Sequence, residues 1–125
     1  MSKCKPETIK IDNVEYVRKS EYKPAKELDG LTYAIIRTYS AGCFAGYINR
    51  SRENPKEATV LHARRLWYWS GASSLSQLAM EGVKNPGECK FPCEVDEVDL
   101  TEIIEVIPAT EDAKKSIDGV SIWKQ

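Results

Sequence analysis

The chain from Leu31 to Asn49 reads LTYAIIRTYSAGCFAGYIN, two runs rich in β-branched, aromatic and small residues on either side of a short turn. Such residues favour pleated strands, and two runs joined through a glycine-containing turn are typical of a β-hairpin. Successive side chains of a strand point to opposite faces, so Tyr33 and Ile35 are expected on one face and Ala34 and Ile36 on the other. This hairpin predicts a sheet at the centre of the fold.

Further short strands are expected on both sides of this hairpin. Their ranges are Thr8 to Arg18, which forms a tight hairpin of its own around Asp12-Asn13, then Thr59 to Trp69, Cys93 to Val98 and Thr101 to Ile107. In the strand from Thr59 to Trp69, strict alternation places His62 and Arg64 on one face and Ala63 and Arg65 on the other.

Two short helices have clear start and stop signals. Ser74 followed by Gln77 has the form of a capping box, and Gly82 ends the helix that it opens. Thr110, followed by two acidic residues, starts a second helix that Gly119 closes. The terminal residues 120–123 are expected to be extended.

These elements predict an α+β fold, a single small domain with an antiparallel or mixed β-sheet and two or three short helices. A chain of 125 residues suits one domain. The domain is expected to span residues 1–125, with residues 1–6 as a flexible N-terminus.

The charge balance excludes several classes of partner. The chain has 18 basic and 19 acidic residues, a net charge of −1, so it has no global field to attract nucleic acid or a membrane surface. No window approaches the ~18 apolar residues of a membrane span, and no apolar segment follows the basic start as a secretory signal would. A cytoplasmic protein that binds neither nucleic acid nor membrane is expected.

The sequence contains no clear set of metal ligands or catalytic residues. Cys89 and Cys93 have a spacing that zinc sites tolerate, but Cys4 and Cys43 do not form a second pair, so free thiols and no metal are predicted. His62 is the only histidine, and no set of nucleophile, base and orienting group is recognisable. We therefore expect no cofactor, no catalytic residues and no enzymatic activity.

The stretch from Arg64 to Ser74, RRLWYWSGASS, is the strongest candidate for a binding site. Guanidinium groups bind phosphates, aromatic faces stack on bases, and free amides at a helix start accept phosphate oxygens. The predicted ligand-binding residues are Arg37, Arg64, Arg65, Trp67, Trp69, Ser70, Gly71, Ala72, Ser73 and Phe91. The alternative is that the tryptophans are core residues, that the Ser/Gly turn is a helix cap, and that Phe91 anchors its loop rather than covering a pocket.

Several motifs between Tyr33 and Trp123 carry a family resemblance, namely Ile36 to Gly42, Phe44 to Tyr47, Ala63 to Trp69, Gly71-Ala72, Leu75 to Ala79 and Lys90 to Val95. In these the chain resembles a widespread family of small phage and prophage proteins. That family is similar to the anti-Thoeris sponges, viral proteins that sequester cyclic ADP-ribose signals made by bacterial TIR immune enzymes.

The resemblance implies a β-sheet protein with helices that forms a homodimer or larger homo-oligomer. It implies a cyclic nucleotide signal as the small-molecule partner, held between subunits by arginine and aromatic side chains in the cytoplasm of an infected bacterium. The signal would be depleted without breaking a bond. The competing hypotheses are a protein that inhibits a host protein by direct contact, a virion or assembly protein, and a nucleotide-degrading enzyme.

Overall fold

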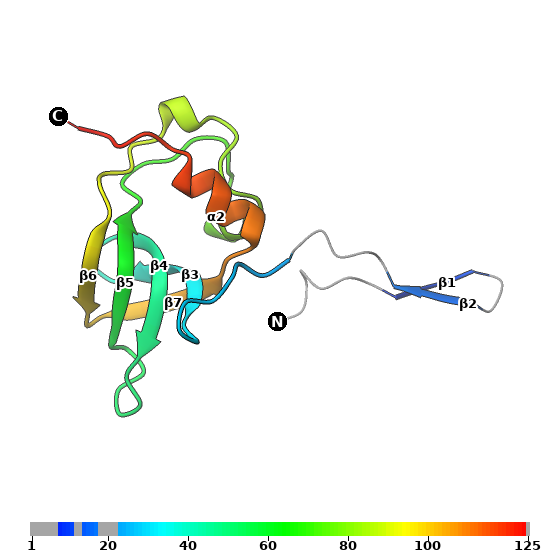
Figure 1. The fold of residues 1–125 in the computed structure, drawn as a ribbon, viewed down its shortest axis with the longest axis horizontal. Coiled ribbons are helices and arrows are strands. Elements are labelled where there is room, and N and C mark those ends of the chain that lie inside the picture. Colours follow the sequence, from blue (N-terminus) through cyan, green and yellow to red (C-terminus); the bar gives the residue numbers. More distant parts are fainter. Residues whose placement is uncertain (1–7, 12–13, 18–22, 125) are drawn as a thin grey trace.

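The computed structural model describes residues 8–11, 14–17 and 23–124 (Figure 1). Its main part is a five-stranded sheet with the order β6-β5-β4-β3-β7, in which every neighbouring pair is antiparallel. The strands are β3 (Thr32–Thr38), β4 (Cys43–Arg50), β5 (Ala58–Arg65), β6 (Val95–Leu100) and β7 (Ile103–Pro108). The remaining elements are α1 (Leu75–Glu81), the 3-10 turn η1 (Pro86–Glu88), α2 (Glu111–Asp118), and a separate two-stranded sheet of β1 (Thr8–Ile11) and β2 (Val14–Val17).

The five-stranded sheet is strongly coiled. Its two edge strands, β6 and β7, are consecutive in the chain and only Thr101 and Glu102 separate them. The edges of the sheet must therefore approach each other at this connection. Figure 1 shows the result, with β7 crossing behind β5 and β4.

The coiled sheet has a hydrophobic core on each face. Inside the curl, Ile36, Phe44 and Val60 pack with Leu100 and Ile103. On the outer face, under the helices, lie Tyr33, Ile35, Ala45 and Leu66 from the sheet, Leu78 and Ala79 from α1, Ala113 and Ile117 from α2, and Phe91. The alternation predicted for the first hairpin is confirmed, because Tyr33 and Ile35 enter one core and Ala34 and Ile36 the other.

Both helices begin at the predicted caps. The Ser74 hydroxyl accepts a hydrogen bond from the Gln77 amide at 3.1 Å, and the Thr110 hydroxyl accepts one from the Ala113 amide at 3.0 Å. Gly82 ends α1 with φ of +78°, and a side chain there would meet Ser116 Cβ of α2 at 2.3 Å. Glycine is therefore required both by the backbone conformation and by the close contact between α1 and α2.

The structure agrees with the predicted fold in outline and differs in three respects. The fold is a small domain with an antiparallel sheet and two α-helices, and it is more β-rich than an α+β description implies. The strand predicted from Thr59 to Trp69 ends at Arg65. Arg65 pairs with Phe44, and β4 starts one residue earlier at Cys43, so the later residues of the predicted strand have no β4 residue to pair with. This strand also contains a β-bulge at His62 that the pattern does not predict, although His62 and Arg64 still share one face and Ala63 and Arg65 the other.

The N-terminal predictions are tested only in part. The two arms of the hairpin predicted between Thr8 and Arg18 pair as β1 and β2, with Ile11 opposite Val14. The predicted flexible segment 1–6 lies outside the described residues. None of the helices that the structure describes is long and apolar enough to cross a membrane.

Candidate ligand pocket

Arg64 is one of the predicted ligand-binding residues, but its side chain is buried and only 7% exposed. Its guanidinium group donates to four main-chain carbonyl oxygens, those of Pro92 (3.0 Å), Ile117 (2.8 Å), Phe91 (3.1 Å) and Val120 (2.7 Å). Ile117 lies in the last turn of α2, and its carbonyl oxygen also accepts a hydrogen bond from the Val120 amide at 3.1 Å. Burial lowers the pKa of Arg64, although an arginine stays charged at any physiological pH. Arg64 therefore ties β5 to the end of α2.

Arg65 lies on the opposite face of the sheet from Arg64. Its guanidinium carbon is 4.4 Å from the centroid of the Phe44 ring, which belongs to the core inside the curl, and it donates to the Ala41 carbonyl oxygen. Arg37 is paired instead with Glu105 of β7, with 2.9 Å between Nε and Oε1. The three predicted arginines do not converge on one concavity.

The predicted aromatic residues are also dispersed. Trp67 is 65% exposed beyond the end of β5, whereas Trp69 packs partly against the outer core. Phe91 is 0% exposed and has the largest fully buried side chain among the residues that the structure describes. It cannot stack on a ligand, and the anchor interpretation of this loop is the one that the structure supports.

The predicted Ser/Gly turn has its polar groups engaged within the protein. The Ser70 hydroxyl donates to Glu88, and both the amide and the hydroxyl of Ser73 donate to Gln77 Oε1. Gly71, at φ +91°, packs against the backbone of Lys84, and Ala72 packs against the outer core. This turn is a helix cap and a packing contact.

A pocket of about 490 Å³ lies between the outer face of the sheet and α2. This volume is within the ~300–1,000 Å³ common for small-molecule sites. The pocket is lined by Leu28, Tyr33, Tyr47, His62, Arg64, Glu94, Lys114, Asp118, Val120 and Ile122. Of the predicted site residues, only Arg64 is among them.

His62 reaches the pocket through a β-bulge. Leu61 pairs with Tyr47 and Arg64 pairs with Ala45, so His62 and its neighbour together oppose the single residue Gly46. His62 has φ of +52°, an uncommon conformation for a residue other than glycine. Bulges re-aim side chains and are frequent beside functional sites.

Gly46 makes this bulge sterically possible. A Cβ atom at Gly46 would lie 2.6 Å from Val60 Cγ1 and 2.9 Å from the Leu61 carbonyl oxygen, both closer than real contacts allow. The bulge also shifts the alternation of β5 by one residue. The faces predicted for the residues from His62 to Arg65 are nevertheless confirmed, because His62 and Arg64 line the pocket while Ala63 and Arg65 pack on the core inside the curl.

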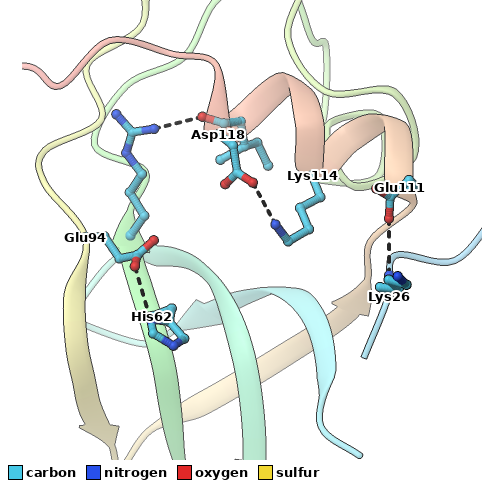
Figure 2. Close-up of polar contacts among 8 residues, drawn as sticks. Lys26, His62, Glu94, Glu111, Lys114 and Asp118 are labelled. Carbon is cyan, nitrogen blue, oxygen red and sulfur yellow. Dashed lines mark hydrogen bonds and ion pairs between the residues drawn. The ribbon is translucent and has the colours of Figure 1, made fainter. Parts of the chain in front are cut away.

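Two acid–base pairs face each other across the pocket (Figure 2). His62 Nδ1 lies 3.1 Å from Glu94 Oε2 on the sheet side, and Lys114 Nζ lies 2.7 Å from Asp118 Oδ2 on α2. Burial acts to lower the pKa of Lys114, but the hydrogen bond and the charge of Asp118 outweigh it and raise that pKa. Lys114 therefore stays protonated at neutral pH.

Two tyrosine rings form the floor beside Lys114. The rings of Tyr33 and Tyr47 meet edge to face with centroids 5.2 Å apart, and Lys114 Nζ lies 5.3 Å and 6.0 Å from them. Such positions allow cation–π attraction. The pocket thus combines flat rings, two cations and two carboxylates.

The Tyr33 hydroxyl is the least satisfied polar group of this pocket. Tyr33 is only 4% exposed, yet its hydroxyl has no hydrogen-bond partner among the residues that the structure describes. Since no fully enclosed side-chain oxygen or nitrogen of the described chain lacks a partner, this hydroxyl is not fully enclosed, and Tyr33 is one of the residues that line the pocket. Burial, with the charge of Asp118 next, raises the pKa of Tyr33, so the hydroxyl keeps its proton.

Only partial signals for these pocket residues are visible in the sequence. Lys114 and Asp118 have the i,i+4 spacing of a helical ion pair, which is common on any helix surface. His62 stands out as the only histidine, but its bulge depends on Gly46 from another strand. The residue pattern predicts Tyr33 and Tyr47 as strand residues and does not mark them as pocket residues.

The described part of the chain contains no group of three or more His, Cys, Asp or Glu side chains placed to hold a metal ion. Cys43, Cys89 and Cys93 carry free thiols, and Cys4 lies outside the described residues. Burial raises the pKa of Cys43, which favours the unreactive thiol form.

Fold and pocket define a small β-rich protein with a concave polar site between a coiled sheet and its C-terminal helix. The chain belongs to the family described as "Domain of unknown function (DUF6948)", whose model matches residues 31–117. This range includes the sheet, both α-helices except the last residue of α2, and all but part of the pocket lining. No curated protein and no solved structure matches the chain.

Proposed function

We propose that this protein binds a small nucleotide-like molecule in the pocket between the sheet and α2 and holds it without breaking a bond. The observation that carries the proposal is the Tyr33 hydroxyl, which has no partner among the described residues and belongs to a side chain that lines a pocket of about 490 Å³. A hydroxyl that is accessible and unpaired within the described protein can both donate to and accept from a ligand.

The chemistry of the lining supports a nucleotide-like ligand. Tyr47, which is only partly buried, offers a ring surface against which a base can pack. The positive charges of Arg64 and Lys114 lie within reach of a phosphate, and Arg64 donates only to neutral carbonyl groups. A phosphate and a base in one ligand would use both features.

The resemblance to anti-Thoeris sponges narrows this ligand class to cyclic ADP-ribose signals. In this proposal the protein is a phage anti-defence protein, works in the cytoplasm of the infected bacterium, forms a homo-oligomer and depletes the signal. An acid–base pair such as His62 and Glu94 is also what hydrolysis would need, so recovery of the ligand unchanged is the result that distinguishes binding from cleavage.

Isothermal titration calorimetry with cyclic ADP-ribose tests this proposal, followed by chromatography of the recovered ligand. We expect saturable binding with one ligand per pocket and recovery of the ligand unchanged. Lys114→Ala should weaken binding at least tenfold, whereas Lys115→Ala, an exposed neighbour on the same helix outside the pocket, should not. Conversion of the ligand would instead identify an enzyme.

A second candidate, direct inhibition of a host protein, is favoured by one observation. Tyr39, Trp67 and Tyr68 are exposed at 79%, 65% and 52%, and tyrosine and tryptophan dominate the binding energy of protein interfaces. These residues do not line the pocket. Loss of inhibition in Trp67→Ala, with ligand binding intact, would support this function in place of the first.

A further inference from the structure

The groups of the pocket that are free to bind are mainly hydrogen-bond acceptors. Glu94 uses Oε2 toward His62 and Asp118 uses Oδ2 toward Lys114. Their other oxygens, Oε1 and Oδ1, have no hydrogen-bond partner among the described residues. A ligand group that meets these oxygens must therefore donate hydrogen bonds.

The acids are also more accessible than the cations. The side chains of Glu94 and Asp118 are 51% and 50% exposed, while that of Lys114 is 23% exposed and Arg64 is buried. Four guanidinium N–H groups of Arg64 are already bound to carbonyl oxygens. A ligand entering the pocket meets two carboxylates before it meets the cations.

The charge balance of the pocket favours a ligand whose hydrogen-bond donor is neutral over one whose donor is a cation. The formal charges of Arg64 and Lys114 cancel those of Glu94 and Asp118, so the pocket has no excess negative charge to hold an ammonium group. A hydroxyl group donates to a carboxylate without adding charge, and it also accepts a hydrogen bond. The Tyr33 hydroxyl can supply that hydrogen bond.

We propose that the pocket recognises the vicinal diol of a ribose, with the ribose hydroxyls donating to Glu94 and Asp118 and accepting from Tyr33. Acidic side chains bind ribose hydroxyls in the same way in dinucleotide-binding proteins. In this arrangement Tyr47 packs against the base that is attached to the ribose. This inference rests on the proposed function for the identity of the ligand as a nucleotide, but the diol itself could belong to a nucleoside or to a free sugar.

The test is calorimetry of the wild-type protein with four probes: cyclic ADP-ribose, adenosine, 2′-deoxyadenosine and D-ribose. We expect adenosine to bind at least tenfold more tightly than 2′-deoxyadenosine. Tyr33→Phe and Asp118→Asn should abolish this preference, while Asp112→Asn, an exposed acid of α2 outside the pocket, should retain it. Thermal unfolding of each variant verifies that it is folded.

The outcomes separate the two proposals. If adenosine and 2′-deoxyadenosine bind with equal affinity and cyclic ADP-ribose still binds, recognition of the diol is overturned and the proposed function stands. If D-ribose binds as tightly as adenosine and cyclic ADP-ribose does not bind, recognition of the diol is supported and the proposal of a nucleotide ligand is overturned. Failure of all four probes to bind overturns both.

Discussion

Nη2 of Arg64 donates a 2.7 Å hydrogen bond to the carbonyl oxygen of Val120, which lies 56 residues further along the chain. The same guanidinium group reaches Ile117 at the end of α2. Arg64 therefore connects the sheet to the helix that forms the other wall of the pocket, by donating hydrogen bonds to main-chain carbonyl oxygens.

Arg64→Met should destabilise the protein strongly. It removes four hydrogen bonds from a buried charged group, and each such bond contributes roughly 1.5–3 kcal/mol when its partner cannot be replaced by water. We expect the free energy of unfolding in urea to fall by about 3 kcal/mol or more. Arg65→Met is the matched control and should cost less than about 1 kcal/mol, because Arg65 is partly exposed and holds one carbonyl. Equal losses would show that Arg64 has no special structural role.

Phe91 and Trp67 should differ sharply in their effect on stability. Phe91→Ala empties the centre of the outer core and should cost about 3–5 kcal/mol. Trp67→Ala should change the free energy of unfolding by less than about 0.5 kcal/mol, since most of this side chain is in solvent. Chemical denaturation of both variants measures this difference, and a stable Phe91→Ala protein would contradict the buried position.

Gly46→Ala should disturb the bulge that holds His62. The added methyl group would overlap with Val60 and Leu61 and should cost about 1–3 kcal/mol. Gly87→Ala is the control, because a Cβ atom there meets nothing within 4 Å. In nuclear magnetic resonance spectra, Gly46→Ala should shift the imidazole signals of His62, whereas Gly87→Ala should not. Unchanged imidazole signals and stability in Gly46→Ala would contradict the proposed role of Gly46.

Tyr33 should make the protein sensitive to alkali. Its pKa is raised in the folded state above the unfolded value of about 10, so the folded state holds the proton more tightly. Its contribution is complete below about pH 10 and is lost as the pH rises toward the folded pKa, at up to about 1.4 kcal/mol per pH unit. Tyr33→Phe should flatten the decline of unfolding free energy above pH 10, and Tyr39→Phe should not. The same slope in all three proteins would show that the Tyr33 hydroxyl is not shielded.

The features that were predictable from sequence depend on neighbouring residues. The hairpin from Leu31 to Asn49, the caps at Ser74 and Thr110 and the stop at Gly82 follow from patterns within a few positions, and all four are present. The features that were missed depend on distant residues. The bulge at His62 needs Gly46, and the burial of Arg64 needs acceptors that lie 27 to 56 residues away.

The candidate site was missed for the same reason. Residue types suggested that arginines and aromatics on one strand would gather around a ligand, but β5 ends at Arg65, and Arg64 and Arg65 point to opposite faces. The pocket instead takes its walls from three separate parts of the chain, represented by Tyr33, Glu94 and Lys114. No local pattern connects them.

Calorimetry with cyclic ADP-ribose on wild type, Lys114→Ala and Arg65→Ala tests the central claim most directly, because Lys114 lines the pocket and Arg65 does not. We expect wild type and Arg65→Ala to bind with the same affinity and Lys114→Ala to bind at least tenfold more weakly. If Arg65→Ala loses binding while Lys114→Ala retains it, the ligand site lies on the other face of the sheet and the proposed pocket is not where the ligand binds.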